Sequence, residues 1–248
     1  MRPACDRRTP LPLIVLSVCA FIGGTAGWWL AARGRTLEGM SILIPAVAGS
    51  AGIGVIWAAV EWIPAVASLD AWIERWSRTH ARGGTDAVLE RVTDLGSSPV
   101  ALAVCGAVAV AALLRRRRLV AAYLVVTPLG SLVSYTAVKY LTNRARPTLN
   151  PDAGALNPAF PSGHAALAAA AYTGAAFALT ALAPEAAPWP RRFLGATAVA
   201  IAVAVGATRV LLGLHWFSDV IAGLMLGWSW WAVATVVLVE RRRPGPPA

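Results

Sequence analysis

Long apolar runs constrain the fold of this 248-residue chain more than any other feature of its sequence. A helix that crosses a bilayer needs about 20 mainly apolar residues, with a range of roughly 17 to 25. The chain offers seven candidate segments of this kind: 11–32, 41–66, 99–114, 119–138, 164–184, 193–212 and 217–239. We therefore expect an all-α fold, a polytopic transmembrane helix bundle.

The composition fits a membrane protein and argues against a nucleic-acid-binding one. Hydrophobic residues make up 57% of the chain and charged residues 14%, with a mean hydropathy of +0.61, which is not the profile of a soluble domain. The net charge is +10, but the cations lie in short runs beside the apolar segments rather than on one binding face. We expect no nucleic-acid partner.

The basic runs also predict the orientation of the helices. Lys and Arg accumulate in short cytoplasmic loops, and two apolar segments separate each basic run from the next: Arg115–Arg118, Arg191–Arg192 and Arg241–Arg243. If these runs are cytoplasmic, three stretches lie outside: 67–98, 139–163 and 213–216. The first has the pattern of an amphipathic helix at the membrane interface. The side of residue 1 stays open, because Arg2, Arg7 and Arg8 compete with Arg33 and Arg35.

Several isolated residues have simple structural explanations. The cysteines form no CxxC pair and no Cys/His cluster, so we expect neither a disulfide nor a metal site: Cys5, Cys19 and Cys105. His80 lies between Arg78 and Arg82, and we expect it on a solvated surface. Glu61 is a lone carboxylate in an apolar segment, and it either faces water near the segment end or has a functional role.

Unusual polar residues mark the ends of the apolar segments that we expect outside. Lys139 stands at the outer end of one segment, and Arg146–Pro147 opens the loop that follows. That loop ends in Phe160–His164, where the next apolar helix begins. The first amides of a helix have no internal partners and can receive an anion. A phosphate could therefore bind at this turn.

A second group of polar residues lies on the same predicted face of the membrane. Arg209 is near the outer end of its segment, His215 is in a short external turn, and Asp219 is in the first turn of the last helix. If that helix begins by residue 215, His215 and Asp219 are neighbours at i and i+4. The orientation was obtained from the basic runs alone, so the convergence of these polar residues is an independent indication of a site.

The residue types in these groups suit phosphoryl transfer. The charge of a phosphoryl group spreads over three oxygens during its transfer. The positive charges of Lys139, Arg146 and Arg209 can neutralise it. The Ser162 hydroxyl and the helix amides can donate hydrogen bonds to the same oxygens. No metal or other cofactor is then required. His215 can act as a nucleophile if Asp219 fixes its tautomer. His164 can protonate the leaving oxygen and later activate water.

Taken singly, these cations and histidines have a simpler explanation. Lys139 and Arg209 could be cations that snorkel to the interface, and each histidine could be satisfied by backbone groups. Asp219 is harder to explain this way, because a carboxylate within an apolar helix needs a partner. The joint spacing of the groups favours a site.

Three blocks of residues within these groups resemble the three-part signature of the type 2 phosphatidic acid phosphatase superfamily. The matching blocks are Lys139–(six residues)–Arg146–Pro147, Pro161–His164, and Arg209–(five residues)–His215–(three residues)–Asp219. Lipid phosphate phosphatases, undecaprenyl-pyrophosphate phosphatases, glucose-6-phosphatase and vanadium haloperoxidases share this signature. Thr208 stands where the family usually has Ser, and it keeps the hydroxyl.

The resemblance implies a role for each motif residue. It implies that His215 becomes a phosphohistidine, that Asp219 orients it, and that His164 is the general acid and base. The residues that bind the substrate phosphate would be Lys139, Arg146, Ser162, Gly163 and Arg209.

The resemblance also implies a division of the chain. The family core has six helices, so 11–32 would be an extra N-terminal apolar helix. We then expect N-terminal apolar segments at 1–66, a phosphatase core at 67–239 and a short cytoplasmic tail at 240–248.

The function expected from sequence is hydrolysis of a phosphate monoester or pyrophosphate of a lipid, in the cell membrane, with the site on the extracytoplasmic side. Candidate substrates are undecaprenyl or other polyprenyl pyrophosphate, phosphatidic acid and phosphatidylglycerol phosphate. A lipid phosphotransferase with the same site is an alternative, and a non-enzymatic anion transporter is a weaker one. Haloperoxidase activity is least favoured, because the known examples are soluble. The sequence does not predict an oligomeric state.

Overall fold

The structure, a computed structural model, describes residues 36–80, 86–147, 157–183 and 188–240. These residues form eight helices and no strand: α2 (Thr36–Trp62), α3 (Pro64–His80), α4 (Asp86–Asp94), α5 (Ser98–Leu114), α6 (Arg118–Thr142), α7 (Gly163–Leu182), α8 (Pro188–Leu211) and α9 (Phe217–Glu240). The all-α prediction is confirmed. The extra apolar segment predicted at 11–32 lies outside the described residues, as do Cys5 and Cys19.

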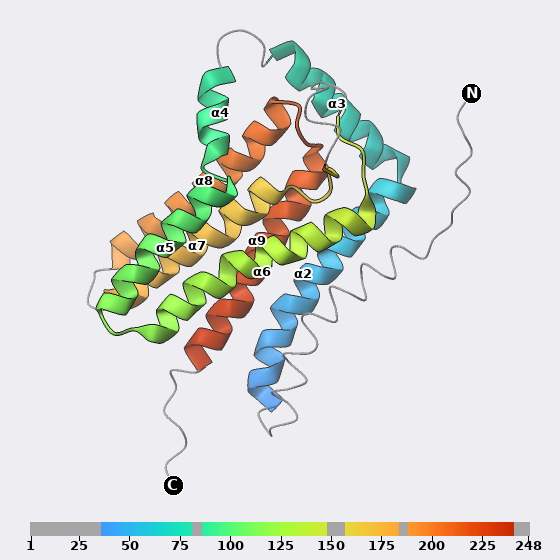
Figure 1. The fold of residues 1–248 in the computed structure, drawn as a ribbon. Helices are drawn as coiled ribbons and strands as arrows, with labels where there is room; N and C mark the ends of the chain where they lie inside the picture. Colours follow the sequence, from blue (N-terminus) through green and yellow to red (C-terminus); the bar gives the residue numbers. More distant parts are fainter. Residues whose placement is uncertain (1–35, 81–85, 148–156, 184–187, 241–248) are drawn as a thin grey trace, which may run out of the picture.

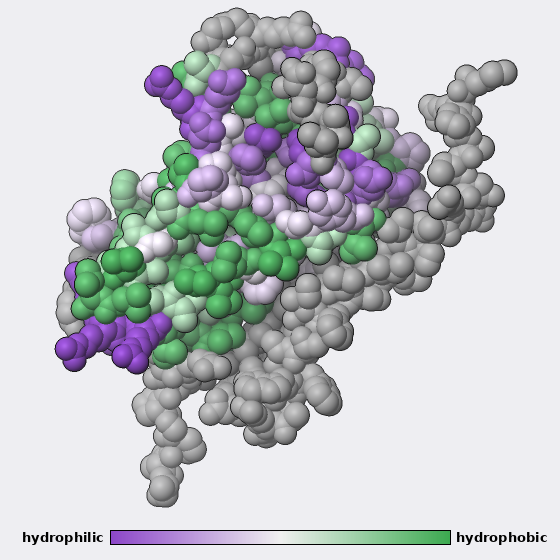
Figure 2. All heavy atoms as spheres, viewed as in Figure 1, coloured by the Kyte–Doolittle hydropathy of each residue, from purple (hydrophilic) through white to green (hydrophobic). Residues whose placement is uncertain are grey.

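The lengths and composition of the helices fit a multi-pass membrane protein. Four helices, α6 to α9, are long and apolar enough to cross a bilayer, and the number rises to six if the bent pairs α2/α3 and α4/α5 each count as one span. Figure 2 shows a hydrophobic belt over the middle of the molecule, with hydrophilic residues gathered at both ends. Exposed apolar side chains such as Leu114, Val125 and Val133 would be in a favourable environment in contact with lipid.

The end of the predicted span 41–66 is wrong, because the chain bends there. α2 ends at Trp62, and α3 leaves it at 88°. Pro64 disfavours helical geometry at Ile63 and is well suited to the first position of a new helix. The bend turns α3 across one end of the bundle (Figure 1).

α7 is the central helix of the bundle and packs against α5, α6, α8 and α9. Seven consecutive residues of α7 are almost completely buried, and six of them are alanines: Ala165–Ala171. Small residues let helix backbones approach closely in a membrane. Gly223 and Gly227 of α9 serve the same purpose, since an added Cβ would collide with the carbonyl oxygens of Ser162 and Ala166. This packing puts the N-terminus of α7 among the ends of its neighbours.

Candidate active site

All the predicted site residues lie at one end of the bundle. They come from the last turn of α6, the loop after it, the start of α7, the end of α8 and the start of α9 (Figure 1). Five of them are buried: Lys139, Ser162, Arg209, His215 and Asp219. Charged groups at such depth need partners, so the contacts of each group indicate its role.

His215 and Asp219 are in contact, as the sequence predicts. His215 Nδ1 lies 3.4 Å from Asp219 Oδ2. The predicted reason is wrong in detail, because α9 begins at Phe217 rather than by residue 215. The contact forms because the carboxylate turns back over the start of the helix, where Oδ2 also accepts a hydrogen bond of 2.9 Å from the Trp216 amide. From the third position of α9, Asp219 thus both satisfies the amide that precedes the helix and contacts the imidazole.

The other nitrogen of His215 faces a cation. Nε2 lies 3.3 Å from Arg146 Nη1. A guanidinium only donates hydrogen bonds, so Nε2 is the acceptor and the ring proton is assigned to Nδ1, beside Asp219. Burial lowers the pKa of His215 well below its usual 6.5, and the nearby cations, Arg146 first, lower it further. The imidazole is therefore neutral at physiological pH, with the lone pair of Nε2 directed at the cationic side.

Arg146 is fixed by the loop that carries it. Its Nε donates to the Asn157 carbonyl at 2.8 Å, and Nη1 donates to the Leu214 carbonyl at 2.8 Å. Partial burial lowers the pKa of Arg146, but arginine remains protonated in proteins. The cation is consequently held beside His215, and it forms no ion pair with a carboxylate of the described residues.

Lys139 and Arg209 complete the cationic group. Lys139 Nζ donates to the Pro158 carbonyl. Arg209 Nη1 donates to Thr93 Oγ1 at 3.3 Å, and Thr93 comes from α4. The positive charges of both residues lower the pKa of His215 further.

Two buried polar atoms of the site have no hydrogen-bond partner among the described residues. They are Ser162 Oγ and Arg209 Nε. A buried donor without a partner is unfavourable by about 1–3 kcal/mol, and Arg209 Nε is such a donor. An oxyanion held between the two residues would supply the missing acceptors.

The start of α7 carries the remaining motif residues. Ser162 occupies the N-cap position, but its side chain makes no cap hydrogen bond, and its amide donates to the Asp219 carbonyl at 2.9 Å. Gly163 packs closely against an aromatic ring, since an added Cβ would lie 2.9 Å from Tyr135 Cε2. His164 follows in the first turn of α7, and the positive charges of Arg209 and Lys139 act on it. The turn therefore lies beside His215.

Sequence reasoning missed a group of residues behind Asp219. Arg144 donates from Nη1 to Asp219 Oδ1 at 2.5 Å and from Nη2 to Asp70 Oδ2 at 2.8 Å. Asp70 also accepts from Ser218, at 3.0 Å from its amide and 2.5 Å from its hydroxyl. The ring of Trp216 lies 5.6 Å from the Arg144 guanidinium carbon. Asp70 of α3 is thus linked to His215 through Arg144 and Asp219.

This group has only a weak signal in the sequence. Asp70 lies in the stretch that was expected to be amphipathic at the interface, and it is buried instead, while Trp72 of the same helix is exposed. Arg144 precedes a motif arginine by two positions and looks like one more loop cation. No spacing rule connects residues 74 positions apart.

Other residues from the sequence analysis lie away from this site. Glu61 is exposed in the last turn of α2, and Cys105 is a buried free thiol in α5. Within the described residues, no group of three His, Cys, Asp or Glu side chains could hold a metal ion. The side chain of His80 is not among those described. Thr208 donates to the Val205 carbonyl at 2.7 Å.

The sequence of this chain is similar to the sequences of two phosphatases from Rhizobium. The chain is 33% identical over 132 residues to lipid A 1-phosphatase from Rhizobium etli and 35% identical over 132 residues to the one from Rhizobium johnstonii. Each match covers 49% of this chain, with 51% and 49% of the respective relative. The chain therefore spans about half the length of these relatives.

A solved structure and a family profile extend the comparison. The fold is similar to the crystal structure of a transmembrane PAP2 type phosphatidylglycerolphosphate phosphatase from Bacillus subtilis, with a TM-score of 0.73 and 25% identity over 80% of this chain and 97% of the other. The profile of the PAP2 superfamily matches residues 119–243, which include all three motifs. This match confirms the resemblance, and the chain belongs to the PAP2 superfamily.

Proposed function

We propose that this chain is an integral membrane phosphatase that removes a phosphate from a lipid through a phosphohistidine formed on His215. The observation that carries the proposal is the pair of contacts made by that ring: Asp219 on Nδ1 and Arg146 near Nε2. The activities named for the Rhizobium and Bacillus proteins support a lipid phosphate as the substrate. We extend the proposal to a core at 67–239, because Asp70 at its start contacts the site.

The first proposed step is transfer of the phosphoryl group to histidine. The lone pair of His215 Nε2 attacks phosphorus, and the bond from phosphorus to the lipid oxygen breaks. His164 donates a proton to that oxygen, so the lipid leaves as an alcohol or, from a pyrophosphate, as a monophosphate. The negative charge on the three equatorial oxygens is stabilised by Lys139, Arg146 and Arg209.

The second proposed step is hydrolysis of the phosphohistidine. His164, now neutral, takes a proton from a water molecule as its oxygen attacks phosphorus. The bond between phosphorus and Nε2 breaks, and inorganic phosphate leaves. His215 carries a positive charge while it is phosphorylated, and Asp219 stabilises that charge through Nδ1–H. Arg144 and Asp70 hold Asp219 in place.

We propose that the site opens to the extracytoplasmic leaflet. Arg115–Arg118 and Arg191–Arg192 lie at the opposite ends of the helices that carry the site, and runs of this kind are typical of the cytoplasmic side. A lipid could then enter sideways, with its phosphate near His215 and its chains in the bilayer.

The proposal is tested with the full chain purified in detergent. Phosphate release should be measured from lipid A 1-phosphate, phosphatidylglycerol phosphate, phosphatidic acid and undecaprenyl pyrophosphate, each with and without a chelator and an acceptor alcohol. We expect release from at least one substrate, insensitive to chelation and absent in His215→Ala. Transfer of the phosphate to the alcohol in place of water would favour the phosphotransferase. Full activity of His215→Ala would contradict the proposal.

A further inference from the structure

Helix α3 has three different sides. One side is buried against the bundle and carries Asp70 and Ser77. A second side carries the apolar residues Leu69 and Trp72, which are exposed, Trp72 by 57%. The third side carries the charged residues: Glu74, Arg75 and Arg78. A helix that packs on a protein in water needs only a buried side and a polar side, so the exposed apolar side indicates a further contact.

The three sides are spaced evenly around the helix. With about 3.6 residues per turn, the apolar side lies roughly 110° from the buried side, and the charged side lies roughly 110° from it in the other direction. A helix that lies flat at the membrane surface, against the edge of a bundle, meets protein, lipid and water on three such sides. The pattern of α3 fits these surroundings.

The level of α3 along the bundle also fits the membrane surface. α3 leaves α2 at 88° and lies across one end of the bundle (Figure 1). Asp70 accepts a hydrogen bond of 3.0 Å from the amide of Ser218, in the first turn of α9. α9 has 24 residues, which is about 36 Å at 1.5 Å per residue, against about 30 Å for the hydrocarbon core of a bilayer. The first turn of α9 is therefore at the level of the lipid headgroups, and α3 lies beside it.

The exposed apolar residues at this level favour lipid as the contact. They begin in the last turn of α2, where Trp62 is 69% exposed, and continue at the bend with the exposed Ile63. Leu69 and Trp72 extend the series along α3. Tryptophan is enriched at membrane–water interfaces, where its ring meets the apolar region and its N–H meets water. A bilayer that surrounds α2 reaches the start of this series.

We propose that the lipid leaflet next to the candidate active site holds α3 in place through Leu69 and Trp72, and that this contact positions Asp70. Asp70 lies between these two residues in sequence, so a shift of the helix at its lipid side also moves Asp70. Asp70 accepts a hydrogen bond from Arg144, which in turn holds Asp219. This positioning role rests on the proposed function, whereas the contact with lipid does not.

The contact with lipid is tested with spin labels on the full chain in phosphatidylcholine vesicles. Single labelling sites are made by Leu69→Cys, Trp72→Cys and Arg75→Cys in a chain whose own cysteines are replaced by alanine: Cys5, Cys19 and Cys105. The access of oxygen, which concentrates in hydrocarbon, is compared with the access of a water-soluble nickel chelate. Labels at positions 69 and 72 should favour oxygen, and the label at position 75 should favour nickel.

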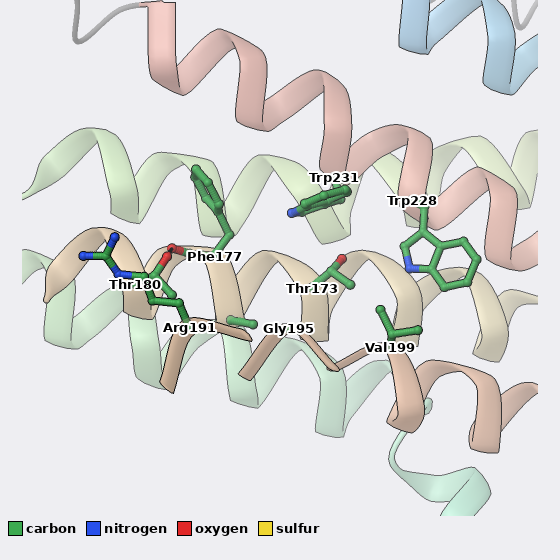
Figure 3. Close-up of a pocket in the computed structure, with 9 residues that line it drawn as sticks. Thr173, Phe177, Thr180, Arg191, Gly195, Val199, Trp228 and Trp231 are labelled. Carbon is green, nitrogen blue, oxygen red and sulfur yellow. Dashed lines mark hydrogen bonds between the residues drawn. The ribbon is translucent and has the colours of Figure 1, made fainter. Parts of the chain in front are cut away.

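A label in the middle of the bundle gives the reference for the hydrocarbon core. Val199 lies midway along α8, where it lines an apolar groove between α7, α8 and α9 (Figure 3). The label of Val199→Cys should be the least accessible to nickel. Labels at positions 69 and 72 should fall between the labels at positions 199 and 75, as expected for the membrane surface.

Activity in the same vesicles tests the positioning role. The double variant Leu69→Gln, Trp72→Gln should lower kcat about fivefold with KM unchanged, because the contact acts through Asp70. Its unfolding temperature should stay close to that of the wild type, since both side chains are exposed. Arg75→Gln, on the charged side of α3, should keep the wild-type kcat. Trp72→Phe should also stay near wild type, because phenylalanine remains apolar.

Each half of the proposal has a result that would overturn it. Equal access of nickel to the labels at positions 69, 72 and 75 would overturn the contact with lipid. A wild-type kcat in the double variant, or an equal loss in Arg75→Gln, would overturn the positioning role. A rise in KM at constant kcat would do the same, because substrate capture would then be affected in place of Asp70. A wild type without phosphatase activity would contradict the proposed function and the positioning role with it, whereas the labels would still test the contact with lipid.

Discussion

The two nitrogens of the His215 ring lie in opposite kinds of surroundings. On the Nδ1 side, the charged groups are paired with each other: Asp219 with Arg144, and Arg144 with Asp70. On the Nε2 side, cations gather, and no carboxylate of the described residues pairs with them. Two buried polar atoms of the site, Ser162 Oγ and Arg209 Nε, also lack a partner within that part of the chain. The paired side can hold the ring in one orientation, and the unpaired side can receive an anion. Substitutions on the two sides should therefore have different effects.

The largest effect should come from Asp219, the carboxylate of the paired side that contacts His215. Asp219→Asn keeps the shape of the side chain but removes the charge that stabilises a positive imidazole. We expect kcat to fall by about 10⁴-fold, as for other carboxylates that orient a catalytic histidine. Steady-state kinetics with the best lipid substrate would measure it, and an unfolding curve would control for stability. A loss below tenfold would break the assigned link between Asp219 and His215.

The next effect should come from the unpaired side. Arg209→Gln removes a cation and the donor Nε, so kcat should fall by about 10²–10³-fold. KM should rise as well, because the ground-state phosphate also loses a partner. Phosphate release across a substrate titration gives both parameters. If KM and kcat both stayed at wild-type values, Arg209 would not bind phosphate.

A smaller effect is expected at Asp70, which is linked to His215 only through Arg144 and Asp219. Asp70→Asn leaves Arg144 with one carboxylate partner instead of two, so Asp219 should be held less firmly. We expect kcat to fall by about tenfold with KM almost unchanged, and stability to fall by about 3 kcal/mol, since a buried ion pair is broken.

A control for Asp70 is available on the same helix. Glu74→Gln breaks the pair that Glu74 forms with Arg78, whose side chain is 43% exposed. Exposed pairs at i and i+4 contribute about 0.3–0.5 kcal/mol, so neither kcat nor stability should change much. Partial rescue of activity by Asp70→Glu would support a positioning role. Identical losses in Asp70→Asn and Glu74→Gln would argue against it.

The burial of His215, together with the cations near it, also predicts a dependence of stability on pH. The pKa of His215 is lowered in the folded protein, so below about pH 6.5 the unfolded chain binds a proton that the folded one does not. Stability should therefore fall as the pH falls through this window, by up to about 1.4 kcal/mol per pH unit. Denaturant titrations of wild type and His215→Gln would measure the difference. An equal slope in both proteins would contradict the assignment.

The same argument predicts the effect of Arg146 on activity. Removing its charge in Arg146→Gln should raise the pKa of His215 toward its usual value, because a neighbouring cation no longer opposes protonation. The acidic limb of the pH–activity profile should shift to higher pH. A limb that stays in place would show that another group controls it.

The smallest effect should be at Thr208. Its hydroxyl donates to the carbonyl of Val205 within α8, and serine can make the same bond. Thr208→Ser should change kcat less than about threefold. A large loss would mean that the methyl group of Thr208 supports the position of Arg209.

The sequence predicted most of the fold because membrane helices follow simple rules of length and polarity. Six of the seven predicted segments correspond to helices that the structure describes, and the seventh, 11–32, lies outside the described residues. The bend after Trp62 was missed, because the apolar run continues through Ile63 and Pro64. Hydropathy alone cannot show that Pro64 starts a new helix.

The sequence predicted the motif residues because they recur at fixed spacings at the helix ends. It missed Asp70, Arg144 and Thr93, because their roles depend on packing between α3, α4 and the rest of the bundle. Asp70 is a buried partner of Arg144 because the bend after Trp62 places α3 across the end of the bundle that holds the site. Such long-range pairs have no local pattern.

The most direct test of the central claim is to trap the phosphoenzyme. His164→Ala should still form the histidine adduct from a labelled substrate with a good leaving group, but hydrolyse it slowly. We predict an acid-labile phosphate that mass spectrometry locates on His215 and that is absent from the double variant His164→Ala, His215→Ala. Label on another residue, or label that persists without His215, would contradict the account.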